Sequence, residues 1–371
     1  MTQQIRVLQI IGKVVGGGVE SVILNYYRHI DHKQVQFDFV VDGEPLPYIY
    51  EEVEKYGGKV FSVTPYSSNI IHYMADIYHI VKEGHYDIIH SNMNTMSGFS
   101  LFAAQLAGAK VRILHNHTTA NKGEGLKTIL KYILRPIAKW PATHYCACSA
   151  LAAEWMYGAE WRKKCHIIYN AIDVSRFLFR EDIRKEKRAE LHIKDDQMVI
   201  GHVGRFMYQK NHDFIIELFK EVLQTYPNAV LLLLGEGPLQ KAIKEKVKAY
   251  HIESQVYFLG VRTDVNEWLQ AMDVFLFPSW YEGLGMAAVE AQISGLPTLM
   301  STYVPKEAKV IENAWFLPLD KNVWVEQLKR IQMQPASREV KKDHLGHYDI
   351  STEAQKLMEY YQQLISKFRE R

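Results

Sequence analysis

Residues 278–297 of the chain read PSWYEGLGMAAVEAQISGLP. The apolar run DVFLF directly before them predicts a buried strand that ends at Pro278, because proline cannot donate to a sheet ladder. A glycine-rich turn follows, and a helix is expected to begin near Leu284 or Gly285 and to end at Gly295. A strand, a glycine turn and a helix in this order direct free backbone N–H groups toward an anion.

Two glutamates accompany this turn and helix. Glu282 lies in the turn, and Glu290 follows eight positions later on the helix. Carboxylates beside an anion site are expected to bind neutral hydroxyls next to phosphates, and this combination indicates a nucleotide sugar. The alternative is a tightly packed strand, turn and helix with two exposed glutamates.

Length and composition limit the possible classes of protein. A chain of 371 residues is long enough for two domains. A formal net charge of +2 makes nucleic acid an unexpected partner. Three cysteines are typical of reduced thiols in a cytosol. Because no apolar run is long enough to span a bilayer and no basic leader precedes the first strand, we expect a cytoplasmic protein.

A second strand and glycine turn open the chain. The apolar strand at residues 5–11 is followed by glycines at 16–18 and a helical pattern. This turn is not a dinucleotide fingerprint, which needs glycine at Ser21, and no Gly-Lys-Ser/Thr follows to make a P-loop. Asp42, at the end of the next strand, lies where a nicotinamide enzyme keeps its ribose acid, so that alternative stays open. Strands and helices alternate onward, which predicts doubly wound parallel sheets with ligands at the carboxyl ends of strands.

Cations follow two strands of the second half. Residues 204–211, GRFMYQKN, place Arg205 and Lys210 five positions apart, where they can bracket a diphosphate. The alternative is a pair of solvated surface cations. Arg262, after another strand, is a weaker candidate for phosphate or base contacts.

Histidines follow strands of the first half. His115 and His117 directly follow the strand at 111–114. A histidine at this place can bind a sugar hydroxyl or a phosphate. The alternative is a pair of capping or core histidines. His90 and Asn92 end the preceding strand and are expected on the acceptor side. His144, Cys146 and Cys148 share a strand face, but zinc would need a fourth ligand that the spacing does not supply, so no metal site is expected.

These motifs together resemble glycosyltransferase family 4, whose members are retaining enzymes. The donor-site pattern P-S-x-x-E-G-x-G-x-x-x-x-E-A-x-x-x-G-x-P matches residues 278–297, and G-R-x-x-x-x-K-[NG] matches 204–211. The turn at 17–20 is similar to the family's G-G-x-E, and residues 170–173 match N-G-[IV]-D with alanine in place of glycine. The absence of a D-x-D motif agrees with a metal-free site. The resemblance covers most of the chain, from Gly17 to about Ser301.

The resemblance implies the GT-B fold: two Rossmann-like, doubly wound α/β domains that face each other across a cleft. The expected bounds are an acceptor domain at 1–172, a linker at 173–196, a nucleotide-sugar domain at 197–345, and a final helix at 346–371 that crosses back to the first domain. The charge-dense composition of 176–196 is the reason for placing the linker there.

The implied reaction moves a hexosyl group, with retention, from a nucleotide diphosphate sugar, UDP-linked in our expectation, to a saccharide or polyprenyl-phosphate-linked acceptor. No cofactor is expected, and relatives of this length commonly build exopolysaccharide, capsule or lipopolysaccharide. The residues expected to take part in catalysis are His117, Glu282, Arg205 and Lys210, with His115 as the alternative histidine. Those expected to bind the donor are Gly17, Gly18, Arg205, Lys210, Arg262, Gly283, Leu284, Gly285, Met286 and Glu290. A GT-B epimerase, a phosphorylase and a non-catalytic nucleotide-sugar-binding protein remain alternatives.

One helix of the first half is basic and amphipathic. Lys127, Lys131, Arg135 and Lys139 recur every four residues, and apolar residues fill the other faces. This pattern predicts docking to an anionic membrane or a lipid-phosphate acceptor, at the inner face of the cell membrane. The alternative is a surface helix with a solvated charged face and a core face.

Overall fold

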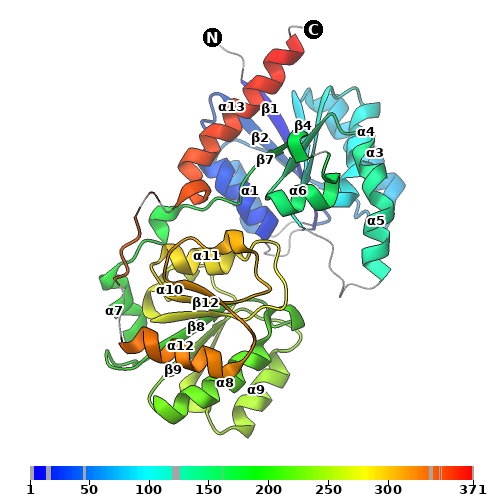
Figure 1. Ribbon diagram of the computed structural model, residues 1–371. Coiled ribbons are helices and arrows are strands. Elements are labelled where there is room, and N and C mark those ends of the chain that lie inside the picture. Colours follow the sequence, from blue (N-terminus) through cyan, green and yellow to red (C-terminus); the bar gives the residue numbers. More distant parts are fainter. Residues whose placement is uncertain are drawn as a thin grey trace. The chain divides into compact units, whose positions relative to one another are not determined.

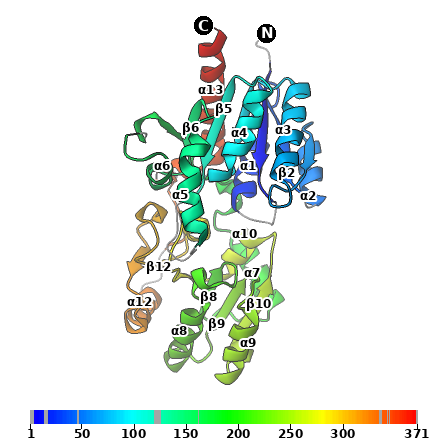
Figure 2. The same ribbon diagram turned by 90° about the vertical axis from the view of Figure 1, so that its right-hand side faces the viewer.

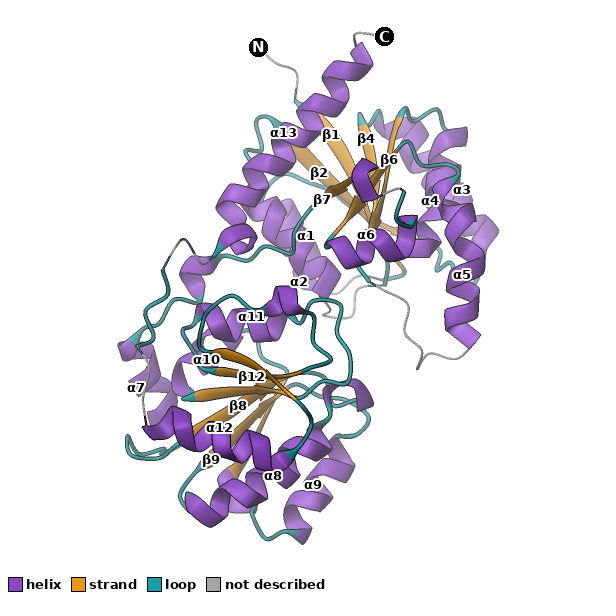
Figure 3. Ribbon diagram, viewed as in Figure 1, coloured by secondary structure: helices purple, strands orange, loops and turns teal. Residues whose placement is uncertain are grey.

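The computed structural model describes residues 4–13, 18–44, 47–118, 126–160, 162–333, 337–341, 343 and 345–369. The chain divides into two compact units (Figure 1): unit 1 comprises Met1–Asp173 and His347–Arg371, and unit 2 comprises Val174–Gly346. Each unit contains one parallel sheet with helices on both faces (Figure 3). The predicted α/β class with doubly wound sheets is confirmed.

The sheet of unit 1 has seven strands in the order β3-β2-β1-β4-β5-β6-β7, and all neighbouring pairs are parallel. The strands are β1 (Ile5–Ile11), β2 (Val35–Asp42), β3 (Val60–Val63), β4 (Ile88–Ser91), β5 (Val111–Asn116), β6 (His144–Ala147) and β7 (Cys165–Ile167). Strand β1 shows why the central strands are almost wholly apolar. Val7 and Ile11 pack into the core on one face of the sheet, and Leu8 and Ile10 pack into the core on the other.

Helices form a layer on each face of this sheet (Figure 2). Side chains of α1 (Gly18–His29), α2 (Pro47–Glu54) and α13 (Ile350–Arg369) pack into one core. Those of α3 (Ile70–Gly84), α4 (Ser97–Leu106), α5 (Leu126–Lys139) and α6 (Ala150–Tyr157) pack into the other. The last helix of the chain therefore belongs to unit 1, where Leu357 and Tyr361 are buried against α1 and the sheet.

The sheet of unit 2 has six parallel strands in the order β10-β9-β8-β11-β12-β13. The strands are β8 (Val199–Val203), β9 (Val230–Leu234), β10 (Val256–Gly260), β11 (Val274–Phe277), β12 (Thr298–Ser301) and β13 (Ala314–Leu317). As predicted, β11 ends at Phe277, directly before Pro278. β13 lies beyond Ser301, where the resemblance to the family ends, and no motif of the sequence predicted it. It is a short apolar strand at the edge of the sheet, and three of its four residues are only partly buried.

The helices of unit 2 also cover both faces of its sheet (Figure 3). Side chains of α8 (His212–Thr225), α9 (Gln240–Ala249) and α12 (Lys321–Met333) pack into the core on one face. Helices α10 (Val265–Ala271) and α11 (Met286–Ile293) contact the strands from the other.

The segment that we expected as a linker, 173–196, is folded into unit 2 over most of its length. It forms α7 (Glu181–Glu190), which packs against α10. Its cations are used internally: Arg184 Nη2 lies 2.6 Å from Asp273 Oδ1, and the buried Lys187 pairs with Asp264 and Glu267. The charge density that indicated an exposed linker therefore reflects ion pairs that attach α7 to the unit.

Candidate active site

Most of the residues expected to bind a donor lie in unit 2, on the loops that follow β8 and β11. The segment 204–211 follows β8, and the segment 278–285 follows the neighbouring β11. Parallel strands end at the same edge of a sheet, so these two loops emerge side by side. Two motifs separated by about 70 positions in the sequence are thus neighbours because of the strand order.

Three hydrogen bonds join the two loops. The backbone N–H of Trp280 donates to the carbonyl of Gln209 at 2.9 Å, and the Gln209 side chain donates to the carbonyl of Tyr281 at 3.0 Å. The Asn211 side chain donates to the carbonyl of Pro278 at 3.2 Å. Sequence reasoning did not select Gln209 or Asn211, which position the loop rather than carry charge.

An ion pair connects the motifs directly. Lys210 Nζ lies 2.7 Å from Glu282 Oε1, with side-chain exposures of 16% and 7%. The ammonium group also lies over the ring of Phe277, 4.5 Å from its centroid. A cation and a carboxylate held together at the carboxyl edge of a parallel sheet can bind a phosphate and a hydroxyl side by side.

Glycines allow the loops at this edge to pack closely. Gly235 has φ +121°, and a Cβ there would lie 2.3 Å from the carbonyl oxygen of Gly204. Gly285 has φ +92° and precedes the first residue of α11, where a Cβ would press on the Phe277 ring. Helix α11 accordingly begins at Met286, slightly later than predicted.

Glu290 lies on the partly exposed side of α11. Burial raises the pKa of its carboxyl to about 7, while the positive charges of Lys210 and Arg176 act in the opposite direction. Met286 and Ala287, in the first turn, are also partly exposed, whereas Ala288 and Val289 are buried. Glu290 and the first two residues of α11 therefore lie on the partly exposed face of this helix.

The two arginine candidates differ in their surroundings. Arg205 is exposed and its guanidinium makes no ion pair with any residue that the structure describes. Arg262 instead makes two hydrogen bonds of 2.7 Å to the carboxylate of Asp264, before α10, and lowers the pKa of that carboxyl. Arg205 is therefore available to an anion, and Arg262 is already paired.

In unit 1, the predicted histidines lie at the carboxyl ends of β4 and β5. His117 Nε2 lies 3.0 Å from Asn92 Oδ1, and His90 Nε2 lies 3.0 Å from His115 Nδ1. The rings of His115 and His117 stack with centroids 3.9 Å apart. Burial lowers the pKa of His90 and of His117 to about 3, so both rings are neutral near pH 7.

Two further members of this cluster escaped sequence reasoning. Gln9, a buried polar side chain of β1, donates to the hydroxyl of Tyr361 at 3.2 Å. The same hydroxyl lies 2.7 Å from His90 Nδ1. A polar residue within a buried strand is a usable signal for Gln9, but nothing local in α13 marks Tyr361.

The first glycine turn is only partly described. Gly17 lies outside the described residues, and Gly18 begins α1. Within the described parts of the chain, no group of three or more His, Cys, Asp or Glu side chains could hold a metal ion. Burial raises the pKa of the Cys148 thiol to about 11, and Cys146 is fully buried. Cys146 lies on β6 and Cys148 follows it, and both side chains pack into the cores of unit 1.

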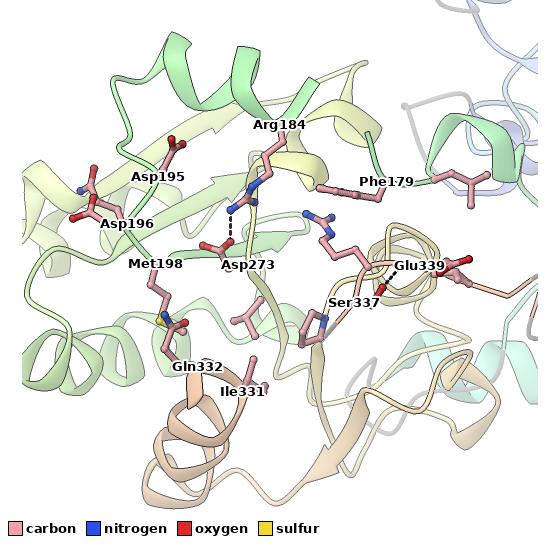
Figure 4. Close-up of a pocket in the computed structure, with 16 residues that line it drawn as sticks. Phe179, Arg184, Asp195, Asp196, Met198, Asp273, Ile331, Gln332, Ser337 and Glu339 are labelled. Carbon is pink, nitrogen blue, oxygen red and sulfur yellow. Dashed lines mark hydrogen bonds and ion pairs between the residues drawn. The ribbon is translucent and has the colours of Figure 1, made fainter. Parts of the chain in front are cut away.

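A cavity of about 810 Å³ lies at the opposite edge of the unit 2 sheet (Figure 4). Met198, Asp273 and Pro297, which line it, precede β8, β11 and β12. Arg184 pairs there with Asp273, and the Arg338 guanidinium donates to backbone carbonyls of α10 and α11. None of the predicted site residues lines this cavity, and its arginines already have partners.

Among the helices that the structure describes, none combines the length and the apolar character that crossing a bilayer requires.

Comparisons with known proteins agree with these motifs. The model for Glycosyltransferase Family 4 matches residues 16–176, and the model for Glycosyl transferases group 1 matches residues 183–335. The chain is 34% identical to the putative glycosyltransferase EpsF of Bacillus subtilis, over 82% of this chain and 81% of the relative. It is 25% identical to the UDP-Gal:alpha-D-GlcNAc-diphosphoundecaprenol alpha-1,3-galactosyltransferase of Escherichia coli, over 76% of each chain.

Solved structures share the fold. The crystal structure of Anabaena HepE in complex with UDP and glucose superposes with a TM-score of 0.80 at 17% identity, covering 96% of this chain and 99% of that chain. The crystal structure of WaaG, a glycosyltransferase involved in lipopolysaccharide biosynthesis, gives a TM-score of 0.71 at 18% identity, covering 96% and 99%. With two doubly wound units of this architecture and a close relative along most of its length, the chain belongs to the family 4 glycosyltransferases and has the GT-B fold.

Proposed function

We propose that this glycosyltransferase transfers a hexosyl group from a UDP-sugar, with retention of configuration and without a metal ion, to a lipid-linked saccharide. The observation that carries this proposal is the pairing of Lys210 with Glu282, because it unites the two motif loops at the carboxyl edge of unit 2. A cation beside a carboxylate suits a ligand in which charged phosphate adjoins a neutral sugar.

Each charged group then has a role. Lys210 and Arg205 stabilise the negative charge that grows on the leaving diphosphate, which is the largest catalytic contribution open to a site without a metal. The N-terminus of α11, with Gly283, Leu284, Gly285 and Met286, adds backbone N–H donors. The departing diphosphate takes the proton of the acceptor hydroxyl as the new glycosidic bond forms on the same face of the sugar.

The two glutamates and the histidine bind hydroxyls. Glu290 accepts hydrogen bonds from the ribose, Glu282 orients the donor sugar, and His117 contacts the sugar and the acceptor position. Gly18, at the first residue of α1, is assigned a backbone contact with the donor diphosphate. Arg262 has no part in this assignment, because Asp264 already engages it.

The relatives support a UDP donor and a lipid-linked acceptor. The Escherichia coli relative is named for UDP-Gal as donor and a GlcNAc-diphosphoundecaprenol acceptor, and HepE was crystallised with UDP and glucose. A polyprenyl-diphosphate-linked acceptor is a building block of cell-surface polysaccharide, so we place the reaction in exopolysaccharide, capsule or lipopolysaccharide synthesis.

Helix α5 supports a location at the inner face of the membrane. Its apolar side chains at 130, 133 and 137 are 53%, 58% and 46% exposed, and Trp140 directly after it is 71% exposed. An ordinary surface helix would turn these residues into the core, where Leu134 and Ala138 alone lie among those described. Lys131, Arg135 and Lys139 add positive charge beside them. Exposed leucine, isoleucine and tryptophan with interleaved cations fit an anionic lipid surface.

The first experiment is calorimetric titration of the protein with UDP, GDP and ADP in excess chelator. We expect tight UDP binding without metal, and binding of none of the three nucleotides would overturn the proposal. Incubation with UDP-hexoses and a polyprenyl-diphosphate-linked saccharide should then give a longer lipid-linked product. Release of an epimerised sugar without any acceptor, or binding without turnover on every acceptor, would assign the chain to another function.

A further inference from the structure

The histidine cluster of unit 1 contains enough hydrogen bonds to fix the positions of its protons. His90, His115 and His117 are linked through Asn92, Gln9 and Tyr361 into one chain of contacts. Each contact needs one hydrogen, supplied by one of its two partners. A single group that can only accept therefore sets the direction of the whole chain.

That group is the backbone carbonyl of His90. The Asn92 amide lies 3.3 Å from this oxygen through its nitrogen, so its other atom, Oδ1, is the one facing His117. A carbonyl oxygen accepts, and His117 Nε2 at 3.0 Å must carry the hydrogen. Because burial keeps the His117 ring neutral, its Nδ1 carries a lone pair.

The same direction passes through the rest of the cluster. The second Asn92 N–H goes to Gln9 Oε1, the Gln9 amide donates to Tyr361, and the Tyr361 hydroxyl donates to His90 Nδ1. His90 Nε2–H then donates to His115 Nδ1, which leaves His115 with a hydrogen on Nε2. Within the described residues, His117 Nδ1 and His115 Nε2 are the ring nitrogens of this cluster that have no partner.

Both of these rings line one small cavity. Its volume is about 20 Å³, enough for about one water molecule. An acceptor on one ring and a donor on its stacked neighbour are complementary to a hydroxyl group, which can donate to the first and accept from the second. An ionised carboxylate or phosphate oxygen has no hydrogen to donate to the unprotonated His117 Nδ1.

We infer that Asn92 and Gln9 are positioning residues that hold His117 in the Nε2–H tautomer, so that its Nδ1 accepts a hydrogen bond from a hydroxyl of the transferred sugar. This inference rests on the proposed function for the identity of the hydroxyl, but the tautomer itself does not. Tyr361, which accepts a hydrogen bond from Gln9, connects this network to α13, far away in the sequence. Deletion of the Asn92 oxygen would free the His117 ring to exchange its proton between the two nitrogens.

The test is nitrogen NMR of the ligand-free protein labelled with ¹⁵N-histidine, which separates protonated from bare ring nitrogens. The chain has sixteen histidines, so His117 is assigned by comparison with His117→Gln. We expect Nε2 protonated and Nδ1 bare for His117 at pH 7. A protonated Nδ1 would overturn the inference, whatever the outcome of the nucleotide titration.

A substitution at Asn92 sharpens the test. Asn92→Ala removes the acceptor that faces His117 Nε2 and should give a mixture of tautomers. We expect Asn92→Ala to lower kcat/KM by about tenfold, the scale of one hydrogen bond, with UDP affinity unchanged. An unaltered His117 spectrum in Asn92→Ala, together with an unchanged melting temperature, would show that Asn92 does not set the tautomer.

Discussion

Lys210 and Glu282 are partners within unit 2, with 2.7 Å between Nζ and Oε1. In our proposal one of them stabilises the leaving diphosphate and the other orients the donor sugar. The pair therefore combines a structural role with two catalytic roles, and these can be separated by measurement.

Lys210→Ala should raise the activation free energy of transfer by about 3 kcal/mol and so lower kcat. The reason is that the cation acts on charge that develops as the bond breaks. Glu282→Ala should abolish transfer with UDP affinity nearly intact. Each single change also leaves a largely buried partner unpaired and should cost about 3 kcal/mol of stability. The double variant should recover part of this stability but none of the rate, as thermal melts and initial rates would reveal. An effect of Lys210→Ala on KM alone would contradict the charge-stabilising role.

Glu290 should make UDP affinity depend on pH. The free carboxyl has a pKa of about 7, raised by burial from an ordinary value of 4.5. Ribose hydroxyls donate best to the ionised form, so binding favours release of the proton, and affinity should rise as pH increases toward 7 and level off above it. Calorimetry from pH 5.5 to 8.5 measures this dependence.

The control for the pH series is Glu290→Gln, which keeps the shape and removes the titration. The ionisation of the UDP phosphates contributes equally to both proteins, so the difference between them isolates Glu290. Glu290→Ala should weaken UDP binding by about 2 kcal/mol. Equal affinities in wild type and Glu290→Ala would exclude the ribose role.

Arg205 and Arg262 should give opposite results although both follow strands of the same sheet, β8 and β10. Arg205→Ala should weaken UDP binding and slow transfer, because its guanidinium has no ion-pair partner among the described residues. Arg262→Ala should leave UDP affinity unchanged and lower the melting temperature, because it removes the bidentate partner of Asp264. A loss of UDP affinity in Arg262→Ala would return this residue to the donor site.

Helix α5 should carry the attraction to lipid. Lys131→Glu with Arg135→Glu should abolish sedimentation with vesicles that contain phosphatidylglycerol, and Ile133→Ser with Ile137→Ser should weaken it. Neither pair should change UDP affinity, because both lie on α5 in unit 1.

A matched control for charge is Lys241→Glu with Lys248→Glu on α9 of unit 2, which changes the net charge by the same amount. A control for apolar exposure is Ile71→Ser on α3, whose side chain is 76% exposed. If the control variants reduce vesicle binding as much as the α5 variants do, the attraction to lipid is unspecific and α5 is an ordinary surface helix.

The local pattern of the sequence determined most of the fold. Strand β1 has the predicted bounds and β11 ends at the predicted residue, because a buried parallel strand is a short apolar run bounded by glycine or proline. The motifs at 204–211 and 278–297 likewise pointed to their places at strand ends. Local pattern failed where residues act through partners elsewhere. The cations of α7 looked like those of an exposed linker, because the sequence does not show that they form ion pairs with Asp264, Glu267 and Asp273.

Only the tertiary structure decided which site residues touch. The strand order places β8 beside β11, and this brings Lys210 to Glu282, while Arg262 meets Asp264. The return of α13 to unit 1 brings the Tyr361 hydroxyl to Gln9 and His90. Sequence gives the type of each side chain and its place on a strand or helix. The partner of a charge or a ring nitrogen depends on contacts between distant segments, which only the folded chain defines.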